Sequence, residues 1–460
     1  MASPTPLLDR RLGLLSATTL VIGSMIGSGI FIVSADISRQ VGSPGLLIAA
    51  WVFTALLTMM AALSYGELAA MMPQAGGQYV YLREAFGPLA GFLFGWTMFL
   101  VIQTGTIAAV AVAFAKFAGV LFPSIAASNQ ILFFVNTQQI VAIGIVLLLT
   151  WVNTRGIGIG SLVQNVFTVA KTGALLGLVL LGLILGRNDA AISANFTNFW
   201  GEGVSGWLMV KLVGVALVGS LFSSDAWNNV TFTAGEIRDP QRNVPLSLVL
   251  GVGIVSLLYI ACNLVYLSVL PLEAIKTAPQ DRVATLVVSQ FMGTGAAQVM
   301  AIAIMVSTFG CVNGLILAGA RVFYAMALDG LFFKSVAKLN PVTNAPVMSL
   351  VLQCIWTCLL TLTGKYGDLL DYVIFAVLLF YMLTIAGIFV LRRTRPNALR
   401  PYKAWGYPFL PATYILLAGL VEVLLLFYKP AYTWPGLIIV LTGIPVFYLW
   451  RRKTGSTESA

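Results

Sequence analysis

The sequence predicts an all-α integral membrane protein with twelve transmembrane helices, and three observations support this prediction. First, hydrophobic residues make up 59% of the 460 residues and charged residues only 9%, whereas soluble domains carry about 25% charged residues. Second, twelve apolar stretches reach the roughly 20 residues that a helix needs to cross a bilayer. Third, glycine and polar residues interrupt the first and sixth stretches, as in membrane proteins built from two inverted repeats.

The twelve stretches use most of the chain, so no soluble domain is expected. Two inverted repeats of five helices each are predicted at 13–186 and 207–391, followed by two further helices within 408–450. A short N-terminal segment, 1–12, and a C-terminal tail, 451–460, flank them. The predicted helices cover 13–36, 44–70, 88–120, 137–153, 161–186, 207–233, 244–269, 294–324, 345–363, 368–391, 408–428 and 433–450.

The formal charge of +10 is distributed unevenly along the chain. With the N-terminus inside, seventeen Lys and Arg residues fall on the cytoplasmic side and six on the outer side. Because positively charged loops remain in the cytoplasm, both termini are expected there. The basic balance is therefore a topology signal and does not predict a nucleic-acid partner. For the basic cluster 392–403, contact with anionic lipid is the second interpretation.

The sequence contains no histidine and four cysteines, each of which lies inside an apolar stretch. The absence of histidine excludes Ser-His-Asp catalysis, histidine-ligated zinc and histidine proton relays. Cysteines inside apolar helices do not predict a disulfide framework. We therefore expect a protein that is not an enzyme and that uses no metal and no cofactor.

The two interruptions, at 23–29 and 219–229, predict broken helices with exposed backbone. Lipid cannot satisfy unwound N–H and C=O groups, so such segments are tolerated where they line a cavity. The N–H groups at the start of a half-helix suit a carboxylate, whereas free carbonyl groups at the end of another suit an ammonium. An α-amino acid carries both groups. The alternative is that the small residues only allow close helix packing.

At these segments the chain resembles a known family. The motif at 23–31, GSMIGSGIF, resembles the first-helix motif of the amino acid–polyamine–organocation (APC) superfamily. The segment 64–88, from SYGEL to YLREAFGP, resembles the superfamily signature after the second helix. The segments 221–245 and 400–411 resemble the L-type amino acid transporter (LAT) branch. The resemblance covers nearly the whole chain and implies a leucine-transporter-like arrangement of helices.

The resemblance also implies a substrate site between the two broken helices. The N–H groups around Ser28 and Gly29 would hold the substrate carboxylate, and carbonyl groups near Ile22, Met25 and Phe222 would hold its ammonium. The Phe222 ring would close over the substrate as a lid. The residues implied to form the site are Ile22, Met25, Ile26, Gly27, Ser28, Gly29, Phe222, Ser223, Asp225 and Asn228.

The chain departs from the family pattern at Asp225-Ala226, where the eukaryotic LAT pattern has two glycines. Two interpretations of Asp225 stay open, an N-cap of the second half-helix or a substrate contact. The family role of Asn228 is to bridge polar groups beside this break. Ser223 and Ser224 leave the side-chain selectivity open.

Lys171 lies near the middle of the fifth predicted helix. A charge at this depth costs at least about 2.5–3.5 kcal/mol, so an interior, partnered role is expected. In the family that the chain resembles, a lysine here takes the place that sodium fills in sodium-coupled relatives. It would reach the first break near Gly23 and Ser24, and polar groups such as Ser307 and Thr308. The alternative is a neutral lysine that serves only as a hydrogen-bond strut.

The resemblance implies sodium-independent transport of neutral L-amino acids by alternating access, as an exchanger. The alternatives are a sodium-coupled or proton-coupled symporter and an antiporter of cationic amino acids or polyamines. Glu67, at the cytoplasmic end of the second helix, either pairs with a loop arginine or acts as a gate together with Phe222.

The loop 121–136 bears on assembly, because it lacks the cysteine that joins animal LAT proteins to a single-span glycoprotein. No disulfide-linked heavy chain is therefore expected. We expect a protein that works alone, as a monomer or weak homo-oligomer, in a bacterial inner membrane.

Overall fold

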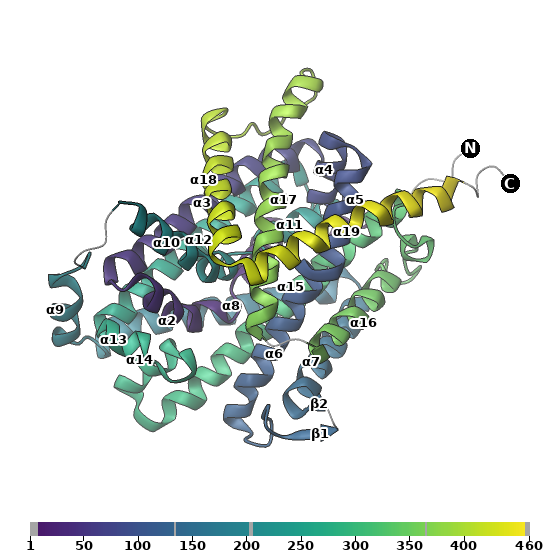
Figure 1. Cartoon of the computed structure of the whole chain (residues 1–460). Helices are drawn as coiled ribbons and strands as arrows, with labels where there is room; N and C mark the ends of the chain where they lie inside the picture. Colours follow the sequence, from purple (N-terminus) through teal and green to yellow (C-terminus); the bar gives the residue numbers. More distant parts are fainter. Residues whose placement is uncertain (1–7, 133–134, 202–205, 364–365, 456–460) are drawn as a thin grey trace.

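The structure, a computed structural model, describes residues 8–132, 135–201, 206–363 and 366–455. Within these residues ten helices are long and apolar enough to cross a membrane, and one bent helix pair adds an eleventh span. The chain is therefore a multi-pass, all-helical membrane protein, as its composition predicts (Figure 1).

The long helices follow the predicted stretches closely. The bent pair is α1 (Leu14–Met25) and α2 (Gly29–Val41). The long spans are α3 (Pro44–Met71), α5 (Pro88–Thr97) continued by η1 (Met98–Ile102) and α6 (Gln103–Leu121), α7 (Thr137–Thr154), α8 (Ile157–Leu185), α10 (Gly206–Ser223), α12 (Pro240–Val269), α15 (Ala296–Leu328), α17 (Tyr366–Thr394), α18 (Phe409–Tyr428) and α19 (Pro430–Gly455). The ninth predicted stretch forms α16 (Val347–Thr363), a shorter helix of 17 residues, so the total of twelve spans stays a prediction.

Short elements connect these helices. The helical ones are α4 (Gln78–Phe86), α9 (Asp189–Thr197), α11 (Asn229–Phe232), η2 (Ala234–Glu236), α13 (Leu272–Lys276), η3 (Pro279–Asp281), α14 (Val283–Met292), η4 (Gly293–Gly295) and η5 (Lys334–Ala337). Two short strands, β1 (Gln130–Leu132) and β2 (Val135–Asn136), pair antiparallel between α6 and α7.

Local sequence signals set several helix starts. Ser43 caps α3 by accepting a hydrogen bond from the Leu46 N–H, and Pro44 takes the first helical position, where its missing N–H costs nothing. Asn136 and Gln139 form a capping box at the start of α7, which satisfies two N–H groups that a helix start leaves free.

The helices of the two predicted repeats pack against each other in matching pairs. The second helices of the repeats, α3 and α12, lie side by side, and so do the third helices, α6 and α15. The halves of the broken helices also meet, because α2 packs along α10. This pairing agrees with two related halves, while the division into inverted repeats at 13–186 and 207–391 stays a prediction.

The span α5–η1–α6 contains a turn of π-helix at η1 (Met98–Ile102). The Gln103 N–H donates to the Met98 carbonyl, and the Thr104 hydroxyl donates to the Phe99 carbonyl at 2.7 Å. The backbone bond of Gln103 reaches back five residues, as a π turn requires, and the Thr104 hydroxyl satisfies the next carbonyl. Such turns recur at functional sites.

Candidate functional site

The first helix breaks where the sequence predicts it. The axes of α1 and α2 differ by 42°, and residues Ile26 to Ser28 lie between the two helices. The Ile26 N–H donates to the Ile22 carbonyl at 2.9 Å and ends α1. Among the described residues, the N–H groups of Gly27 and Gly29 have no hydrogen-bond acceptor. These groups point from the positive end of α2, which favours a negatively charged ligand.

The ammonium of Lys171 binds the carbonyl groups of this break. Its Nζ lies 2.6 Å from the Gly23 carbonyl oxygen, 2.7 Å from that of Ile26 and 3.1 Å from that of Ser307 on α15. The side chain is completely buried. Three carbonyl oxygens around one buried ammonium satisfy both the charge and the unwound backbone.

Of the two α15 residues expected near Lys171, Ser307 and Thr308, only Ser307 forms hydrogen bonds with the first break within the described residues. The Ser307 hydroxyl bonds the carbonyl groups of Ile26 and Gly27, at 3.2 and 2.9 Å, so Ser307 holds the break through both its backbone and its side chain. The expectation that Thr308 meets Lys171 is wrong, because its hydroxyl bonds the backbone of its own helix at Ile304.

The second break separates α10 from α11 and contains Ala226 in a left-handed conformation, with φ of 62°. It touches the first break directly. A methyl group added at Gly29 would lie 2.1 Å from the Ser223 hydroxyl oxygen and 3.1 Å from the Ser223 Cα. The hydroxyl of Tyr259, on α12, lies 3.1 Å from the Met25 carbonyl oxygen and 3.0 Å from that of Ser223. One tyrosine therefore ties together the ends of α1 and α10.

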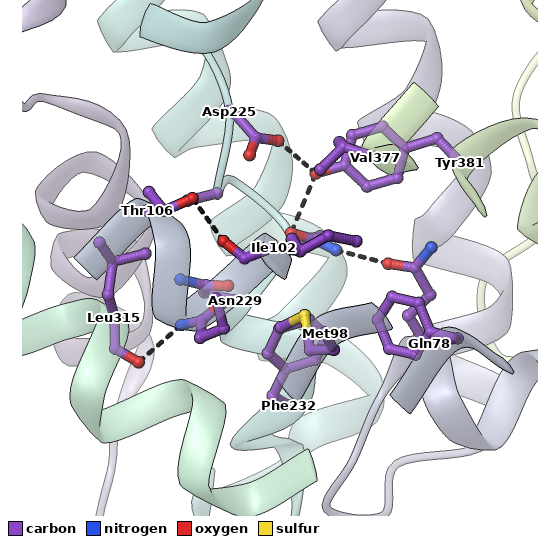
Figure 2. Close-up of a pocket in the computed structure, with 14 residues that line it drawn as sticks. Gln78, Met98, Ile102, Thr106, Asp225, Asn229, Phe232, Leu315, Val377 and Tyr381 are labelled. Atoms are coloured by element: carbon purple, nitrogen blue, oxygen red, sulfur yellow. Dashed lines mark hydrogen bonds between the residues drawn. The ribbon is translucent and has the colours of Figure 1, made fainter. Parts of the chain in front are cut away.

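A chain of side-chain hydrogen bonds holds the second break (Figure 2). The Tyr381 hydroxyl, on α17, lies 2.7 Å from Asp225 Oδ1 and 3.1 Å from Asn228 Oδ1. The Asn228 amide donates to Gln78 Oε1 at 2.8 Å, and the Gln78 amide donates to the Thr384 hydroxyl at 3.0 Å. Asn228 thus bridges polar groups beside the break, and its partners extend the network to α4.

The N-cap interpretation of Asp225 is wrong. The second half-helix, α11, begins at Asn229 with Asn228 in the cap position. The Asp225 carboxylate instead accepts the hydroxyl of Tyr381. Because the left-handed Ala226 turns the chain between Asp225 and α11, the carboxylate faces α17. Its role in contacting substrate stays a prediction.

Two small cavities lie on either side of Asp225 and Tyr381, and both residues line each of them. Each has a volume of about 20 Å³, which is room for about one water molecule. The first is lined by the π turn at Met98 and Ile102 and by polar groups of α4, α6 and α11 (Figure 2). Neither cavity can hold an amino acid, so the breaks are closed around each other in this conformation.

The carbonyl groups predicted to hold a substrate ammonium have partners here. Those of Ile22 and Phe222 accept from the N–H groups of Ile26 and Asp225, and that of Met25 accepts from Tyr259. A carbonyl oxygen has two lone pairs, so each can still accept a second bond. The Phe222 side chain is 9% exposed.

Glu67 ends α3 inside a cluster of arginines, as one of its two interpretations predicts. Arg392 forms two hydrogen bonds to it, at 2.9 and 2.6 Å, and Arg400 adds a contact of 3.2 Å. The Ala404 N–H donates to the same carboxylate at 2.7 Å. The carboxylate is 2% exposed, so its charge is matched almost entirely by protein groups.

A second buried ion pair lies after α11. Arg321 makes a bidentate contact with Glu236, at 2.8 and 3.0 Å, and both side chains are buried. Beside it, Leu12 pairs with Ile237 in a β-bridge, with Leu12 bonded to the Glu236 carbonyl and to the Arg238 N–H. The start of α1 is therefore tied to the segment that follows the second break.

Sequence reasoning missed Tyr259, Tyr381 and Gln78. Each tyrosine lies in the apolar middle of a long helix, Tyr259 within 240–269 and Tyr381 within 373–394. That position inside a predicted span is a signal, because a buried hydroxyl needs a partner. Gln78 follows two glycines that the resemblance singled out, and it lies completely buried on α4.

Comparison with known proteins adds independent information. The amino acid permease family matches residues 12–447 of the chain. The large neutral amino acids transporter small subunit 2 of Homo sapiens is 32% identical over 458 residues, which cover 97% of this chain and 82% of that protein. The Asc-type amino acid transporter 1 of Mus musculus is 29% identical over 463 residues, with 98% and 84% covered. The b(0,+)-type amino acid transporter 1 of Mus musculus is 28% identical over 449 residues, with 97% and 89% covered.

Proposed function

The chain belongs to the amino acid permease family, and on that premise we propose that it exchanges neutral L-amino acids across a membrane without sodium, by alternating access. The observation that carries the proposal is the Lys171 ammonium, bound by the carbonyl groups of Gly23, Ile26 and Ser307. Carbonyl oxygens in a buried ring are also what a sodium ion would need. The Lys171 ammonium occupies this position and its carbonyl oxygens, so a sodium ion has no room to bind there.

The substrate site proposed here uses both breaks. The substrate carboxylate binds the N–H groups from Gly27 to Gly29 at the positive end of α2. Its ammonium binds carbonyl oxygens at the ends of α1 and α10, and Phe222 closes over it. Because the breaks touch at Gly29 and Ser223, binding requires them to separate. Glu67 and its arginines act as a gate at the predicted cytoplasmic side.

The runner-up is a proton-coupled symporter or an antiporter of cationic amino acids or polyamines. The observation that favours it is the buried Asp225 carboxylate, which lines both cavities beside the second break. A polyamine needs more than one carboxylate to match its charges. Asp225 is the single carboxylate that lines these two cavities, which places the runner-up second.

A counterflow assay tests the proposal. Proteoliposomes are loaded with unlabelled amino acids of different classes, and uptake of labelled leucine is followed with sodium or choline outside, with and without a pH gradient. We expect equal rates in sodium and choline and strong stimulation by internal neutral amino acids. A strict sodium requirement contradicts the role of Lys171, and stimulation only by internal arginine or by a proton gradient selects the runner-up.

We also propose that the chain needs no disulfide-linked partner and lies in a bacterial inner membrane with both termini in the cytoplasm. The relative named a small subunit is by that name part of an assembly. In this chain, all four cysteines lie in helices and three are buried. The purified chain, reconstituted alone as a monomer or weak homo-oligomer, is therefore expected to exchange amino acids. Activity that depends on a second protein contradicts this.

A further inference from the structure

Residues 393–409 run from the last turn of α17 through the connection to the first residue of α18, and they contain most of the basic cluster 392–403, for which lipid contact is the second interpretation. The structure divides this cluster into two groups. Arg392 and Arg400 face Glu67, and Arg395 binds Glu84 at 2.6 Å. These three arginines hold the segment against α3 and α4.

The second group faces outward. Arg393 and Lys403 are exposed, and within the described parts of the chain neither side chain has a hydrogen bond or an ion pair. The same segment exposes three large apolar side chains, Leu399 at 75%, Trp405 at 69% and Phe409 at 79%. Exposed cations and exposed aromatic rings in one short segment at the ends of two membrane helices match the phosphate and the interface of a phospholipid.

The segment is held in place without a ligand. The Arg400 guanidinium donates to the carbonyl groups of Leu391 and Arg395, at 3.0 and 2.9 Å. The Tyr402 ring lies so close to Gly66 that an added methyl group there would be 2.7 Å from it. A ligand would therefore meet preformed groups and lose little affinity to the ordering of the loop.

We propose that residues 393–409 form a binding site for an anionic phospholipid, with the phosphate on Arg393 and Lys403 and with Trp405 and Phe409 in the membrane interface. Since the same segment binds Glu67 on α3 and Glu84 on α4, a bound lipid fixes the arrangement of three helix ends. The site takes a lipid of the membrane leaflet and is independent of the transported substrate.

Native mass spectrometry of the detergent-purified full chain tests the site. Dioleoyl-phosphatidylglycerol is expected to bind at least about tenfold more tightly than dioleoyl-phosphatidylcholine, and the double substitution R393Q/K403Q is expected to remove most of that preference, because each cation contributes about 1 kcal/mol. The control is R238Q/R242Q, which removes two exposed cations from another segment, of which Arg238 donates to the Arg10 carbonyl at 3.4 Å, and it is expected to leave the preference unchanged. Thermal midpoints of all variants confirm folding, because the substituted side chains are exposed.

A second measurement locates the lipid. Brominated phosphatidylglycerol is expected to quench a fluorescence component that W405F lacks, more strongly than brominated phosphatidylcholine does. Equal binding of the two lipids, or a preserved preference in R393Q/K403Q, overturns the proposal. Soluble glycerol phosphate that binds the chain as well as phosphatidylglycerol also overturns it, because the site is then for a free anion.

Discussion

The two helix breaks look alike in sequence but are stabilised by different chemistry. At the first break, the side-chain amine of Lys171 on α8 donates to the carbonyl groups of Gly23 and Ile26. At the second, a hydroxyl from α17 and amides from α11 and α4 hold Asp225 in a network with no cationic member. The first break is tied to α8 and α15, and the second to α17 and α4.

This difference shows that small residues permit a helix break but do not determine how the break is stabilised. Glycine and serine make a break permissible, but the groups that satisfy the freed backbone come from distant helices. Removing the Lys171 amine takes a donor from three carbonyl groups in a membrane interior, where, among the described residues, only the Ser307 hydroxyl, on the Ile26 carbonyl, remains at the break. The network at the second break can exchange partners, because hydroxyl and amide groups both donate and accept. We therefore expect substitutions at the first break to have larger effects.

The largest effect is expected for Lys171→Ala, which removes the charge of the first break. Three carbonyl groups lose the Lys171 amine as a donor, and of these the Ile26 carbonyl keeps the Ser307 hydroxyl. Because a lost donor costs about 1–3 kcal/mol where no other donor replaces it, exchange should fall at least about a hundredfold in counterflow assays. Lys211→Ala is the control, since Lys211 packs on Tyr428 at 4.3 Å, away from both breaks. Unchanged flux in Lys171→Ala contradicts the role of the charge, and recovery in sodium buffer supports the sodium-position interpretation.

The contact between the two breaks is tested by Gly29→Ala. The new methyl group meets the Ser223 side chain and approaches its Cα, and overpacking of this kind costs about 1–3 kcal/mol. We expect roughly tenfold slower exchange at unchanged expression. Gly27→Ala is the matched control, because its methyl group meets only the Cys311 sulfur, at 3.5 Å. Equal effects of the two substitutions show that the direct contact at Gly29 is unimportant.

A smaller effect is expected for Tyr381→Phe, which removes one hydroxyl from the network of the second break. Asp225 and Asn228 lose the one hydroxyl that they share, but the cavities on either side of Asp225 have room for a water molecule that replaces it. We expect roughly threefold to tenfold slower exchange, measured as initial rates. Tyr448→Phe, at a 56% exposed position on α19, is the control. A loss as large as that of Lys171→Ala contradicts the proposed difference between the breaks.

The smallest effect concerns α4, the helix at the far end of the second network. Burial raises the pKa of the Glu84 carboxyl, but hydrogen bonds from Arg395 and Arg83 outweigh it and hold the pKa below the ordinary 4.5. A carboxyl with a lowered pKa stabilises the fold above its unfolded pKa, and this contribution is lost as the pH falls through the folded value. Between pH 5 and pH 3, roughly, the thermal midpoint of the native chain should therefore fall more steeply than that of Glu84→Gln. Parallel curves contradict a role of this ion pair in anchoring α4.

Much of the fold was predictable because lipid constrains it strongly. Apolar length predicted the bounds of most long helices to within a few residues, since a span must satisfy all of its backbone groups. The bounds of α16 (Val347–Thr363) also lie within two residues of the predicted stretch 345–363. Its described length of 17 residues is close to the minimum for a span, so apolar length alone does not decide whether it crosses the membrane.

The site residues that could be predicted are those of a type that is rare inside a membrane span, and those of a common type could not be predicted. Lys171 is conspicuous because a charge in mid-membrane needs partners. Its contacts with Gly23 and Ser307 are among those that the resemblance implied, whereas its contact with Ile26 was not predicted and the one with Thr308 is not formed. Tyr259 and Tyr381 resemble many other tyrosines in apolar helices. Their acceptors lie far away in the chain, so that only the folded arrangement identifies them. The roles of all these residues in transport stay predictions.

The π turn at Met98–Ile102 has a consequence for how this helix tolerates insertions and deletions. It holds one more residue than an α-helical turn would, so everything after Gln103 is rotated by about 100° relative to a regular helix. Deleting one residue there would let the span revert to a continuous α-helix and turn Gln103 and Thr106, which line the first cavity, toward other neighbours. At this position, the deletion or insertion of one residue changes which side chains of α6 face the first cavity.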